Sequence, residues 1–553
     1  MKFWKRRYIA IIAIVLVAVT SVGYTYSDVF FQIKKSLTIF GDVFREVSLN
    51  YVDKIDPPKL MGTAVDAVLQ TLDPYTVFID ESDNQEINII TKGKYAGVGL
   101  EVGARGGNLV VIAPLDGYPA YRKGVKAGDI ILSVNGQSIE ELSPEELQNQ
   151  LRGEAGTNLS LTIKRYGVDQ PLTFDLIREE IIIHNVKYYG FTDSSKTIGY
   201  ILISHFSENT AEEVTEAIKN LQKQSRLDGL ILDLRNNPGG LLSEAVKTVD
   251  LFVKPGLEIV RIKGREVESN TPYYSSEMPL YGSKPLVVLQ NNGSASASEI
   301  VAGALQDLDR AVIIGDNSFG KGLVQVIKPL SYNTALKITT AKYYTPSGRC
   351  IQAINYNHDE NVSNGASKIP DSLRRAFKTR NGRTVFDGTG IEPDVYIKEH
   401  KEKLLEIALQ QHSLYFFYAN EYVAKHKDFN VKQSSDSLYD SFRKFIKEKK
   451  FSLQTPAGQM IAHLREQLKD PAIEEKAKTN LNDLEQLVAI RNNEEMKREA
   501  PGIKKQLYLE LVSRYKGTKG KIEAELQFDT YIRMAVKVLN NRPEYNKILA
   551  VKN

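Results

Sequence analysis

The sequence contains a single cysteine, Cys350, among its 553 residues. One cysteine excludes an intramolecular disulfide and any metal site built on cysteine ligands. We expect a protein that works without a metal or any other cofactor. Cys350 is an alternative nucleophile, but no histidine patterns with it, so the sequence gives this alternative little support.

Excess charge of one sign is also lacking. The 72 Lys and Arg residues nearly balance 68 Asp and Glu, which leaves a net charge of +4. Without a basic stripe carrying interleaved aromatics, we expect no nucleic-acid partner. The seven histidines are scattered and no G-x-S-x-G motif occurs, so a Ser-His-Asp triad has no obvious base. A Ser-Lys pair is the known alternative.

A long apolar run occurs near the first residue, where Tyr8 to Val22 follow four Lys and Arg residues. This pattern is typical of a signal peptide or of an uncleaved membrane anchor. No clear small-x-small cleavage site follows the run, so the anchor is favoured for residues 1–27. Both alternatives export the remainder. We expect a cell-envelope protein anchored in the inner (plasma) membrane, with its catalytic part in the periplasm or outside.

The stretch from Leu286 to Gln325 combines several features of a nucleophile site. An apolar run typical of a buried parallel strand leads through Asn291-Asn292-Gly293 into Ser294-Ala295-Ser296-Ala297-Ser298 and an amphipathic helix. A serine on such a sharp strand-to-helix turn presents its hydroxyl beside helix N–H groups. A helix N-cap is the structural alternative for any one serine.

The segment resembles the carboxyl-terminal processing proteases, also called tail-specific proteases. Their nucleophile is the middle serine of S-A-S-A-S-E, here Ser296, and their general base is the lysine of F-G-K-G, here Lys321. The family's supporting glutamine matches Gln325. If Lys321 and Gln325 lie on one strand, their side chains face the same side, where the glutamine can hold the lysine amine by a hydrogen bond. The aspartate of A-L-Q-D matches Asp307. The resemblance implies a serine endopeptidase that forms an acyl-enzyme and selects protein substrates by their free C-terminal tails.

Asp307 fits this catalytic set poorly on geometry. If Ser296 begins one helix, Asp307 lies about 16 Å along its axis. We therefore expect Asp307 to form a cap or an ion pair at the far end of the helix, despite its place in the family's pattern.

A second glycine-rich turn, Asn237-Pro238-Gly239-Gly240, follows a buried strand. Any α/β protein can have such a turn. In the context of the family, we favour half of an oxyanion hole, in which N–H groups of Gly239 or Gly240 join that of Ala297.

Residues 86–168 resemble a PDZ domain. The segment Gly97-Val98-Gly99-Leu100 matches its carboxylate-binding loop, where glycines let main-chain N–H groups approach an anionic chain end. Val98 and Leu100 are expected to line or support an apolar pocket. The strands, helix and turns that follow occur in the order that a PDZ domain requires.

The fold class predicted from these elements is multidomain α/β. Residues 28–85 form N-terminal helices, for which a dimerisation arm is one interpretation. Residues 169–396 form the protease core, into which the PDZ domain is inserted. The family implies a spiral sheet like that of the crotonases. Residues 397–553 are charged and helical, and we expect an accessory domain that supports self-assembly into a homo-oligomer.

Two other functions remain open. A PDZ scaffold on an inactive protease core would keep the fold, but the retention of Ser296, Lys321 and Gln325 argues against it. A crotonase-like acyl-CoA enzyme is compatible with the glycine turns, but neither a PDZ domain nor a Ser-Lys pair is expected there.

Overall fold

The computed structural model describes residues 29–550, apart from short segments within that range. Those left out are 82–88, 90, 193–194, 266–269, 357–366, 398–402, 431, 433–434, 452, 454 and 469–473. The predicted signal or anchor segment, 1–27, lies outside the described residues. Within them, no helix has the length and apolar character needed to cross a membrane.

The chain divides into two compact units, Met1–Asp80 with Ile327–Ile338, and Glu81–Val326 with Thr339–Asn553. In the first unit, a helix covers residues 29–50 and is followed by α2 (Pro57–Leu69) and β1 (Val77–Ile79). Asp56 is the N-cap of α2, and Pro57 opens the helix because the first turn needs no N–H from it. β1 pairs antiparallel with residues 335–337 of β18 (Ala335–Tyr344).

The second unit contains an antiparallel sheet with the strand order β3-β4-β5-β7-β8, and β6 pairs with β5. Its elements are β3 (Leu100–Arg105), β4 (Asn108–Pro114), α4 (Pro119–Arg122), β5 (Ile130–Val134), β6 (Gln137–Ser138), η1 (Ile139–Glu141), α5 (Pro144–Leu151), β7 (Asn158–Lys164) and β8 (Leu172–Ile177). The strands and helices predicted for a PDZ domain are all present. The sheet extends beyond the predicted boundary at 168, because Leu176 of β8 belongs to the same buried core as Val111 and Leu161.

The region predicted to be the protease core is built on a six-stranded sheet with the order β10-β11-β12-β15-β16-β23. The strands are β10 (Val186–Phe191), β11 (Ile198–Ile203), β12 (Gly229–Asp233), β15 (Leu286–Gln290), β16 (Val312–Gly315) and β23 (Val395–Tyr396). All neighbours are parallel except β10, which runs antiparallel to β11. The central strands are continuous apolar runs because both faces of the sheet are covered.

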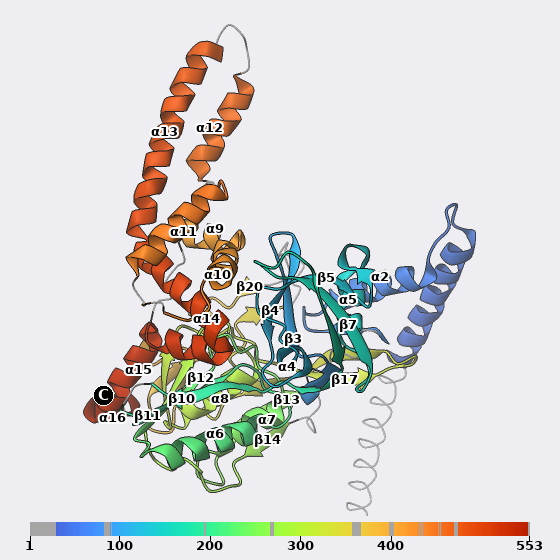
Figure 1. The fold of residues 1–553 in the computed structure, drawn as a ribbon. Coiled ribbons are helices and arrows are strands. Elements are labelled where there is room, and N and C mark those ends of the chain that lie inside the picture. Colours follow the sequence, from blue (N-terminus) through green and yellow to red (C-terminus); the bar gives the residue numbers. More distant parts are fainter. Residues whose placement is uncertain are drawn as a thin grey trace, which may run out of the picture. The chain divides into compact units, whose positions relative to one another are not determined.

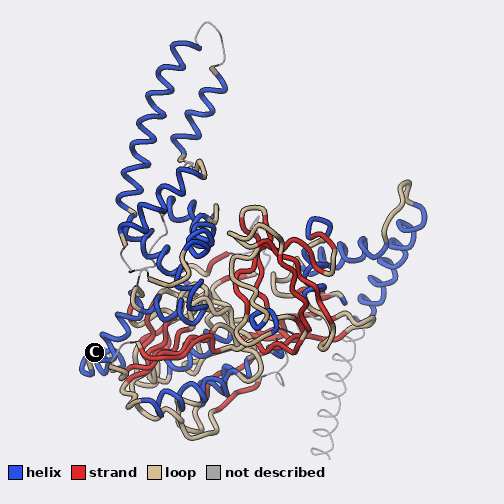
Figure 2. Tube along the Cα trace, in the orientation of Figure 1, coloured by secondary structure: helices blue, strands red, loops and turns tan. Residues whose placement is uncertain are grey.

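Helices lie on both sides of this sheet (Figures 1 and 2). Side chains along its strands alternate between the two faces. In β15, Leu286 and Val288 join the core formed with α6 (Thr210–Gln224), α7 (Leu242–Asp250) and α8 (Ala297–Asp307). Val287 and Leu289 point to the opposite face, where α15 (Thr530–Asn540) and α16 (Arg542–Leu549) lie. The sheet is therefore a layered α/β core, and the predicted multidomain α/β class is confirmed.

The last two helices of the region predicted as an accessory domain, α15 and α16, lie on the six-stranded sheet. Ile532, Val538 and Leu539 pack on the catalytic sheet, and the Tyr545 hydroxyl lies 3.1 Å from the main-chain nitrogen of Leu286. Sequence periodicity shows that a helix has an apolar face, but not which distant surface that face covers.

The other helices of this region form their own core. They are α9 (Leu404–Gln411), α10 (Leu414–Lys425), α11 (Asp436–Glu448), α12 (Pro456–Gln467), α13 (Glu474–Arg498) and α14 (Ala500–Leu526). Tyr415 and Tyr418 are buried there against Phe442, with ring centroids 5.2 Å from its ring in both cases. These aromatic side chains are therefore part of the core of this helical region.

Helix α10 also contacts three loop glycines of the PDZ sheet, through side chains about one turn apart. The pairs are Gly106 with Phe417, Gly128 with Asn420 and Gly167 with Ala424. A Cβ atom at Gly128 would lie 2.1 Å from the Asn420 side-chain oxygen, so only glycine fits at that contact.

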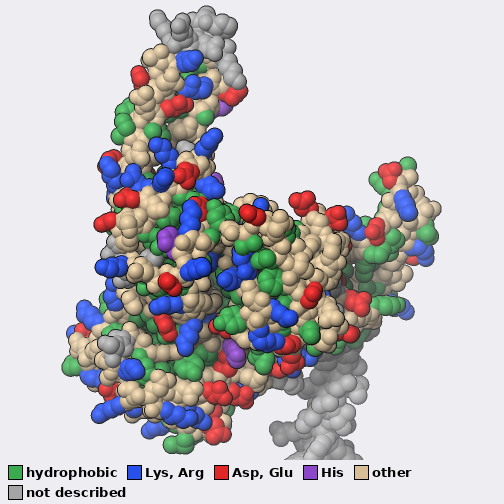
Figure 3. All heavy atoms as spheres, in the orientation of Figure 1, with side chains coloured by type: hydrophobic (Ala, Val, Ile, Leu, Met, Phe, Trp, Pro, Cys, Tyr) green, Lys and Arg blue, Asp and Glu red, His purple; other side chains and the backbone are tan. Residues whose placement is uncertain are grey.

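The remaining strands form a further sheet with β1 and β18, and several two-stranded pairs. They are β2 (Lys94–Gly97), which pairs with β9 (Glu179–Ile182); β13 (Glu258–Gly264), which pairs with β14 (Thr271–Tyr274) and with β18; β17 (Leu323–Pro329), which pairs with β18; and the short pairs β19 (Ile354–Asn355) with β20 (Ser367–Lys368) and β21 (Ala376–Lys378) with β22 (Thr384–Phe386). Over the face drawn in Figure 3, Lys and Arg side chains are interspersed with Asp and Glu.

Candidate active site

Ser296 lies at the sharp turn between β15 and α8, as the sequence predicts. It is the residue immediately before α8, and its backbone has φ 56° and ψ −113°. L-residues rarely adopt positive φ, and the ψ value lies outside the left-handed helical region. The surrounding structure must hold this conformation in place, as is common at functional sites.

The three serines of the turn have different hydrogen bonds. The Ser294 hydroxyl donates to the Leu234 carbonyl at 2.7 Å, and the Ser298 hydroxyl donates to the Asn237 carbonyl at 2.9 Å. Both side chains are buried, whereas Ser296 is partly exposed. Ser294 and Ser298 therefore join the turn to the end of β12, and Ser296 is the one accessible to a substrate.

Glu299, which the sequence analysis assigned no role, lies at the centre of the site. Its fully buried carboxylate accepts four hydrogen bonds from both sides of the site. Oε2 accepts from the main-chain N–H groups of Ser296 at 2.8 Å and Lys321 at 2.9 Å. Oε1 accepts from the Ser318 hydroxyl at 2.6 Å and the Gly320 N–H at 2.7 Å. One carboxylate thus joins the two segments that carry the predicted nucleophile and base.

Burial raises the pKa of Glu299 to about 7, although its four hydrogen bonds act in the opposite direction. Burial disfavours the charged form. The hydrogen-bond donors favour it, because a protonated carboxyl group would itself be a donor at one of its oxygens. The signal was present in the sequence, because the S-x-x-E spacing places Glu299 where a capping-box glutamate lies. That pattern does not distinguish a surface cap from a buried junction.

Tyr343 links the same two segments from another direction. Its hydroxyl lies 3.2 Å from the Ser296 carbonyl oxygen and within hydrogen-bond distance of the Lys321 carbonyl oxygen. The side chain is almost completely buried. The sequence analysis assigned Tyr343 no role.

Lys321 lies in the loop before β17 and is partly buried. The sequence analysis placed Lys321 and Gln325 on one strand, but β17 starts only at Leu323, so strand alternation does not relate these two side chains. Gln325 lies on β17, where its side-chain amide donates to the Thr339 hydroxyl at 3.1 Å. The supporting role of Gln325 stays a prediction.

The turn after β12 packs directly against Ser296. A Cβ atom at Gly239 would lie 2.8 Å from both the Ser296 Cβ and the Ala297 nitrogen, so a side chain there would fill the space beside Ser296. The Gly239 N–H donates to the Asn237 side-chain oxygen at 2.9 Å and is therefore engaged within the turn. Gly240 is exposed, and a Cβ atom there would lie 2.0 Å from the Phe206 carbonyl oxygen. Ala297 is the first residue of α8, a position whose N–H has no intrahelical acceptor.

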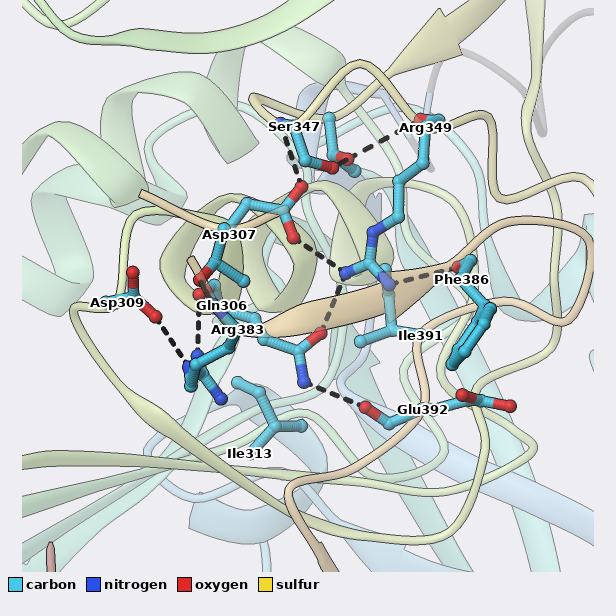
Figure 4. A network of polar contacts seen from close by, with 12 residues as sticks. Gln306, Asp307, Asp309, Ile313, Ser347, Arg349, Arg383, Phe386, Ile391 and Glu392 are labelled. Carbon is cyan, nitrogen blue, oxygen red and sulfur yellow. Dashed lines mark hydrogen bonds and ion pairs between the residues drawn. The ribbon is translucent and has the colours of Figure 1, made fainter. Parts of the chain in front are cut away.

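Asp307 is the last residue of α8, at the opposite end from Ser296. Figure 4 shows it in a buried polar network. Its carboxylate forms an ion pair with Arg349 at 2.8 Å, in which both side chains are fully buried, and accepts from the Ser347 N–H at 3.1 Å. Arg349 also donates to the Gln306 side chain at 2.7 Å. The structure therefore does not bring Asp307 to Ser296, and the geometric expectation of a structural ion pair is the one it supports.

The predicted carboxylate-binding loop connects β2 to β3. Val98 is buried in the PDZ core, and its carbonyl accepts from Ala120 N–H at 3.0 Å, while Leu100 is partly buried at the start of β3. Gly99 has φ 73°, and a Cβ atom there would lie 2.5 Å from the Tyr118 Cβ. Arg152, a residue without an assigned role, lies opposite Gly97 in an isolated bridge. Its guanidinium is 5.5 Å from the centre of the Tyr95 ring.

Among the described residues, no group of His, Cys, Asp and Glu side chains has an arrangement that would hold a metal ion. Cys350 is largely buried, and this burial raises the pKa of its thiol, which disfavours the reactive thiolate.

Three family descriptions match separate parts of the chain. They are "Peptidase family S41" over residues 197–362, "PDZ domain" over residues 110–165 and "Probable PDZ-protease, C-terminal helical domain" over residues 405–539. The first match contains Ser296 and Lys321, and the second lies within the sheet that starts at β3.

Curated relatives cover most of the same region. A carboxy-terminal-processing protease of Bartonella bacilliformis is 44% identical over 328 residues, which is 59% of this chain and 74% of the relative. The carboxy-terminal processing protease CtpB of Bacillus subtilis is 34% identical over 393 residues, which is 69% of this chain and 81% of the relative. A solved structure, the photosystem II D1 C-terminal processing protease, is 28% identical and covers 65% of this chain and 92% of its own, with a TM-score of 0.34.

We expect Glu299 to make stability depend on pH. Its folded-state pKa of about 7 exceeds the ordinary value of 4.5, so the folded protein binds more protons than the unfolded chain between these values. The free energy of unfolding of the wild type, relative to Glu299→Gln, should therefore fall by about 3 kcal/mol as the pH rises from 4.5 to 7. Urea unfolding at a series of pH values measures this difference. The exposed Glu212→Gln serves as the control and should give a curve parallel to the wild type. A parallel curve for Glu299→Gln as well would contradict the assignment.

Proposed function

The chain belongs to peptidase family S41, among the carboxy-terminal processing proteases, and from this premise we propose that Ser296 and Lys321 form its catalytic dyad. The observation that carries the proposal is the Glu299 carboxylate, which binds the main-chain N–H groups of both residues through one oxygen. The neighbouring serines support the choice of Ser296, because both of their hydroxyls donate to buried carbonyls.

The reaction proceeds through an acyl-enzyme. Neutral Lys321 takes the proton from the Ser296 hydroxyl as the oxygen attacks the scissile carbonyl carbon. The lysine ammonium then gives this proton to the leaving amine, and an ester links the substrate to Ser296. In the second step the same amine takes a proton from water as the water attacks the ester. The resulting ammonium gives this proton to the Ser296 oxygen when the ester bond breaks. An ordinary lysine has a pKa of about 10.4, so the loop must favour the neutral amine at working pH.

The negative oxygen that develops during attack is stabilised by main-chain N–H groups. Ala297 is one donor, because it is the first residue of α8 and lies beside Ser296. Gly240 is the better second donor, since the N–H of Gly239 is engaged by the Asn237 side chain. Gly239 contributes by its lack of a side chain, which keeps the space before Ser296 and Ala297 open.

The PDZ domain selects free C-terminal tails in this proposal. β3 is the first strand of its sheet order, so one edge pairs with no other strand of that sheet and can accept a peptide as an added strand. The loop Gly97 to Leu100 lies at the start of this strand, where it meets the terminal carboxylate. The alternative of an inactive scaffold gains no support, because Ser296 and Lys321 are joined in one buried hydrogen-bond network.

We also propose that the protein is exported, anchored by residues 1–27 and self-associated through the helix over residues 29–50. The basic and apolar pattern of the first 22 residues supports the anchor. The helix supports self-association, because apolar side chains such as Phe30 and Leu37 are 69% and 66% exposed. A second copy of the chain would remove these side chains from water.

Substituting Ser296 by Ala should abolish peptide cleavage with normal folding. Ser298→Ala should retain cleavage and lose about 1 kcal/mol of stability with its buried hydrogen bond. Lys321→Ala should reduce kcat by several orders of magnitude, and Lys321→Arg should not restore it, because a guanidinium stays protonated. Peptide hydrolysis and urea unfolding of the four variants measure these effects. Residual activity in Ser296→Ala comparable to the wild type would rule out this nucleophile.

Cleavage should depend on the charge of the substrate's C-terminus. Replacing the free acid by an amide should weaken apparent affinity by about 1.5–3 kcal/mol, or roughly tenfold to a hundredfold. The same peptide in both forms is compared with the wild type and with Gly99→Val, whose side chain would collide with Tyr118. The variant should cleave both forms alike. Equal cleavage of acid and amide by the wild type would show that the domain does not select chain ends.

The full chain should sediment with membranes, and a form lacking residues 1–27 should remain in the supernatant. Light scattering should show that this shortened form is an oligomer. Phe30→Ser with Leu37→Ser should convert that form to a monomer. Lys34→Ser with Lys35→Ser, on the same helix, is the control and should remain oligomeric. Recovery of the full chain in the soluble fraction would contradict the anchor, and a monomeric unsubstituted form would contradict self-association.

A further inference from the structure

A cluster of three charged side chains lies where β12 ends and the turn beside Ser296 begins. Asp233 is the last residue of β12, Arg235 belongs to the turn, and Asp529 precedes helix α15. The Arg235 guanidinium donates to Asp233 from Nε at 2.9 Å and to the Asp529 carboxylate from Nη2 at 2.7 Å. The side chains of Arg235 and Asp529 are only 18% and 19% exposed, so solvent screens the pair weakly.

Each oxygen of Asp529 has a separate partner. Oδ1 accepts from the main-chain N–H groups of Tyr531 at 2.8 Å and Ile532 at 3.2 Å, which caps α15. Oδ2 binds Arg235, whose guanidinium also lies 4.9 Å from the centre of the Tyr531 ring. Because cap and ion pair use different oxygens, a substitution can remove the ion pair and keep the cap.

From Arg235, the turn continues directly into the groups beside the nucleophile. The Arg235 N–H donates to Asp233 at 3.0 Å, and the Asn236 N–H donates to the Asn291 side chain at 2.9 Å. The Asn237 carbonyl accepts from the Ala295 N–H at 3.0 Å and from the Ser298 hydroxyl at 2.9 Å. A shift of Arg235 therefore reaches both the glycines of the turn and the loop that carries Ser296.

Removing the Asp529 charge would not leave Arg235 unpaired. Asp233 still binds it, and the Tyr200 hydroxyl donates to Asp233 at 2.8 Å. The remaining pair is neutral overall, so the expected consequence is displacement of the turn and not exposure of an isolated buried charge.

We propose that Asp529 is a positioning residue for catalysis, which holds Arg235 and thereby fixes the turn of Gly239 and Gly240 against the Ser296 loop. The inference rests on the proposed function of this turn as part of the oxyanion site. The N-cap of α15 thus supplies geometry to an active site whose Ser296 and Lys321 lie more than 200 residues earlier in the chain.

The test compares Asp529→Asn with the wild type in the full chain. Asparagine caps helices as well as aspartate does but carries no charge for Arg235. We expect kcat per active site to fall roughly tenfold, with KM for the same peptide changed less than twofold, because only transition-state contacts are displaced. A peptide aldehyde, which adds to Ser296 and forms an oxyanion, should lose affinity by a similar factor. Binding of the uncleaved peptide to Ser296→Ala with and without Asp529→Asn should be equal.

Two further variants keep the result interpretable. Asp228→Asn removes an exposed ion pair with Arg226 just before β12 and should leave kcat unchanged. Arg235→Lys keeps the charge but lacks the planar guanidinium that binds Asp233 through Nε and Asp529 through Nη2, so it should reproduce the loss. Its combination with Asp529→Asn should lose no more than the larger single loss. The inference would be overturned by an unchanged kcat in Asp529→Asn, or by a fall in its kcat that only follows the fraction of the variant unfolded in urea. It would also be overturned if the kcat losses of the two single variants multiplied in the double variant. Absence of cleavage or aldehyde binding by the wild type would instead count against the proposed function.

Discussion

The active site depends on one buried carboxylate. A charged Glu299 without partners would be costly in the interior, and its four donors offset this cost only when all of them are in place. Those donors come from the Ser296 turn and from the loop that carries Gly320 and Lys321. The positive φ of Ser296 is maintained by the same contacts, because an unfavourable backbone conformation persists only where its surroundings restrain it. The conformation of Ser296 and the position of the loop that carries Lys321 therefore depend on the same hydrogen bonds.

The restraint on this loop continues outward through the sheet. Ser294 and Ser298 bind carbonyls at the end of β12, and the Tyr343 hydroxyl contacts the carbonyls of Ser296 and Lys321. At the other end of α8, the ion pair of Asp307 with Arg349 joins the end of the helix to the segment that carries Arg349. Buried ion pairs contribute little net stability, but they specify one arrangement of the groups that they join. The helix behind Ser296 is thus held at both ends.

Much of this arrangement was accessible from the sequence because it follows from local patterns. The apolar run Leu286 to Leu289, the turn and the small residues before α8 predict a strand, a turn and a nucleophile position in order. The helical spacing also predicts that Asp307 lies at the far end of α8. The functions of Glu299 and Asp529 were not accessible, because their partners are set by tertiary packing. Glu299 has the pattern of an ordinary capping residue, and Asp529 lies far along the chain from Arg235. The strand placement of Lys321 was wrong because β17 starts only at Leu323, after the two glycines that flank the lysine.

Helices α15 and α16 cover one face of the catalytic sheet, so the core of this sheet can be completed only after both helices have been synthesised. A ribosome makes the chain from its first residue onward, at about 5–20 residues per second, so Gln325 precedes Leu549 by roughly 10–45 s. During this interval the segments that carry Ser296 and Lys321 exist, but one face of their sheet still lacks its helices. A nascent chain therefore carries the chemical groups of a protease before it has the finished core that holds them, and translation of the last helices sets the moment at which that core can close.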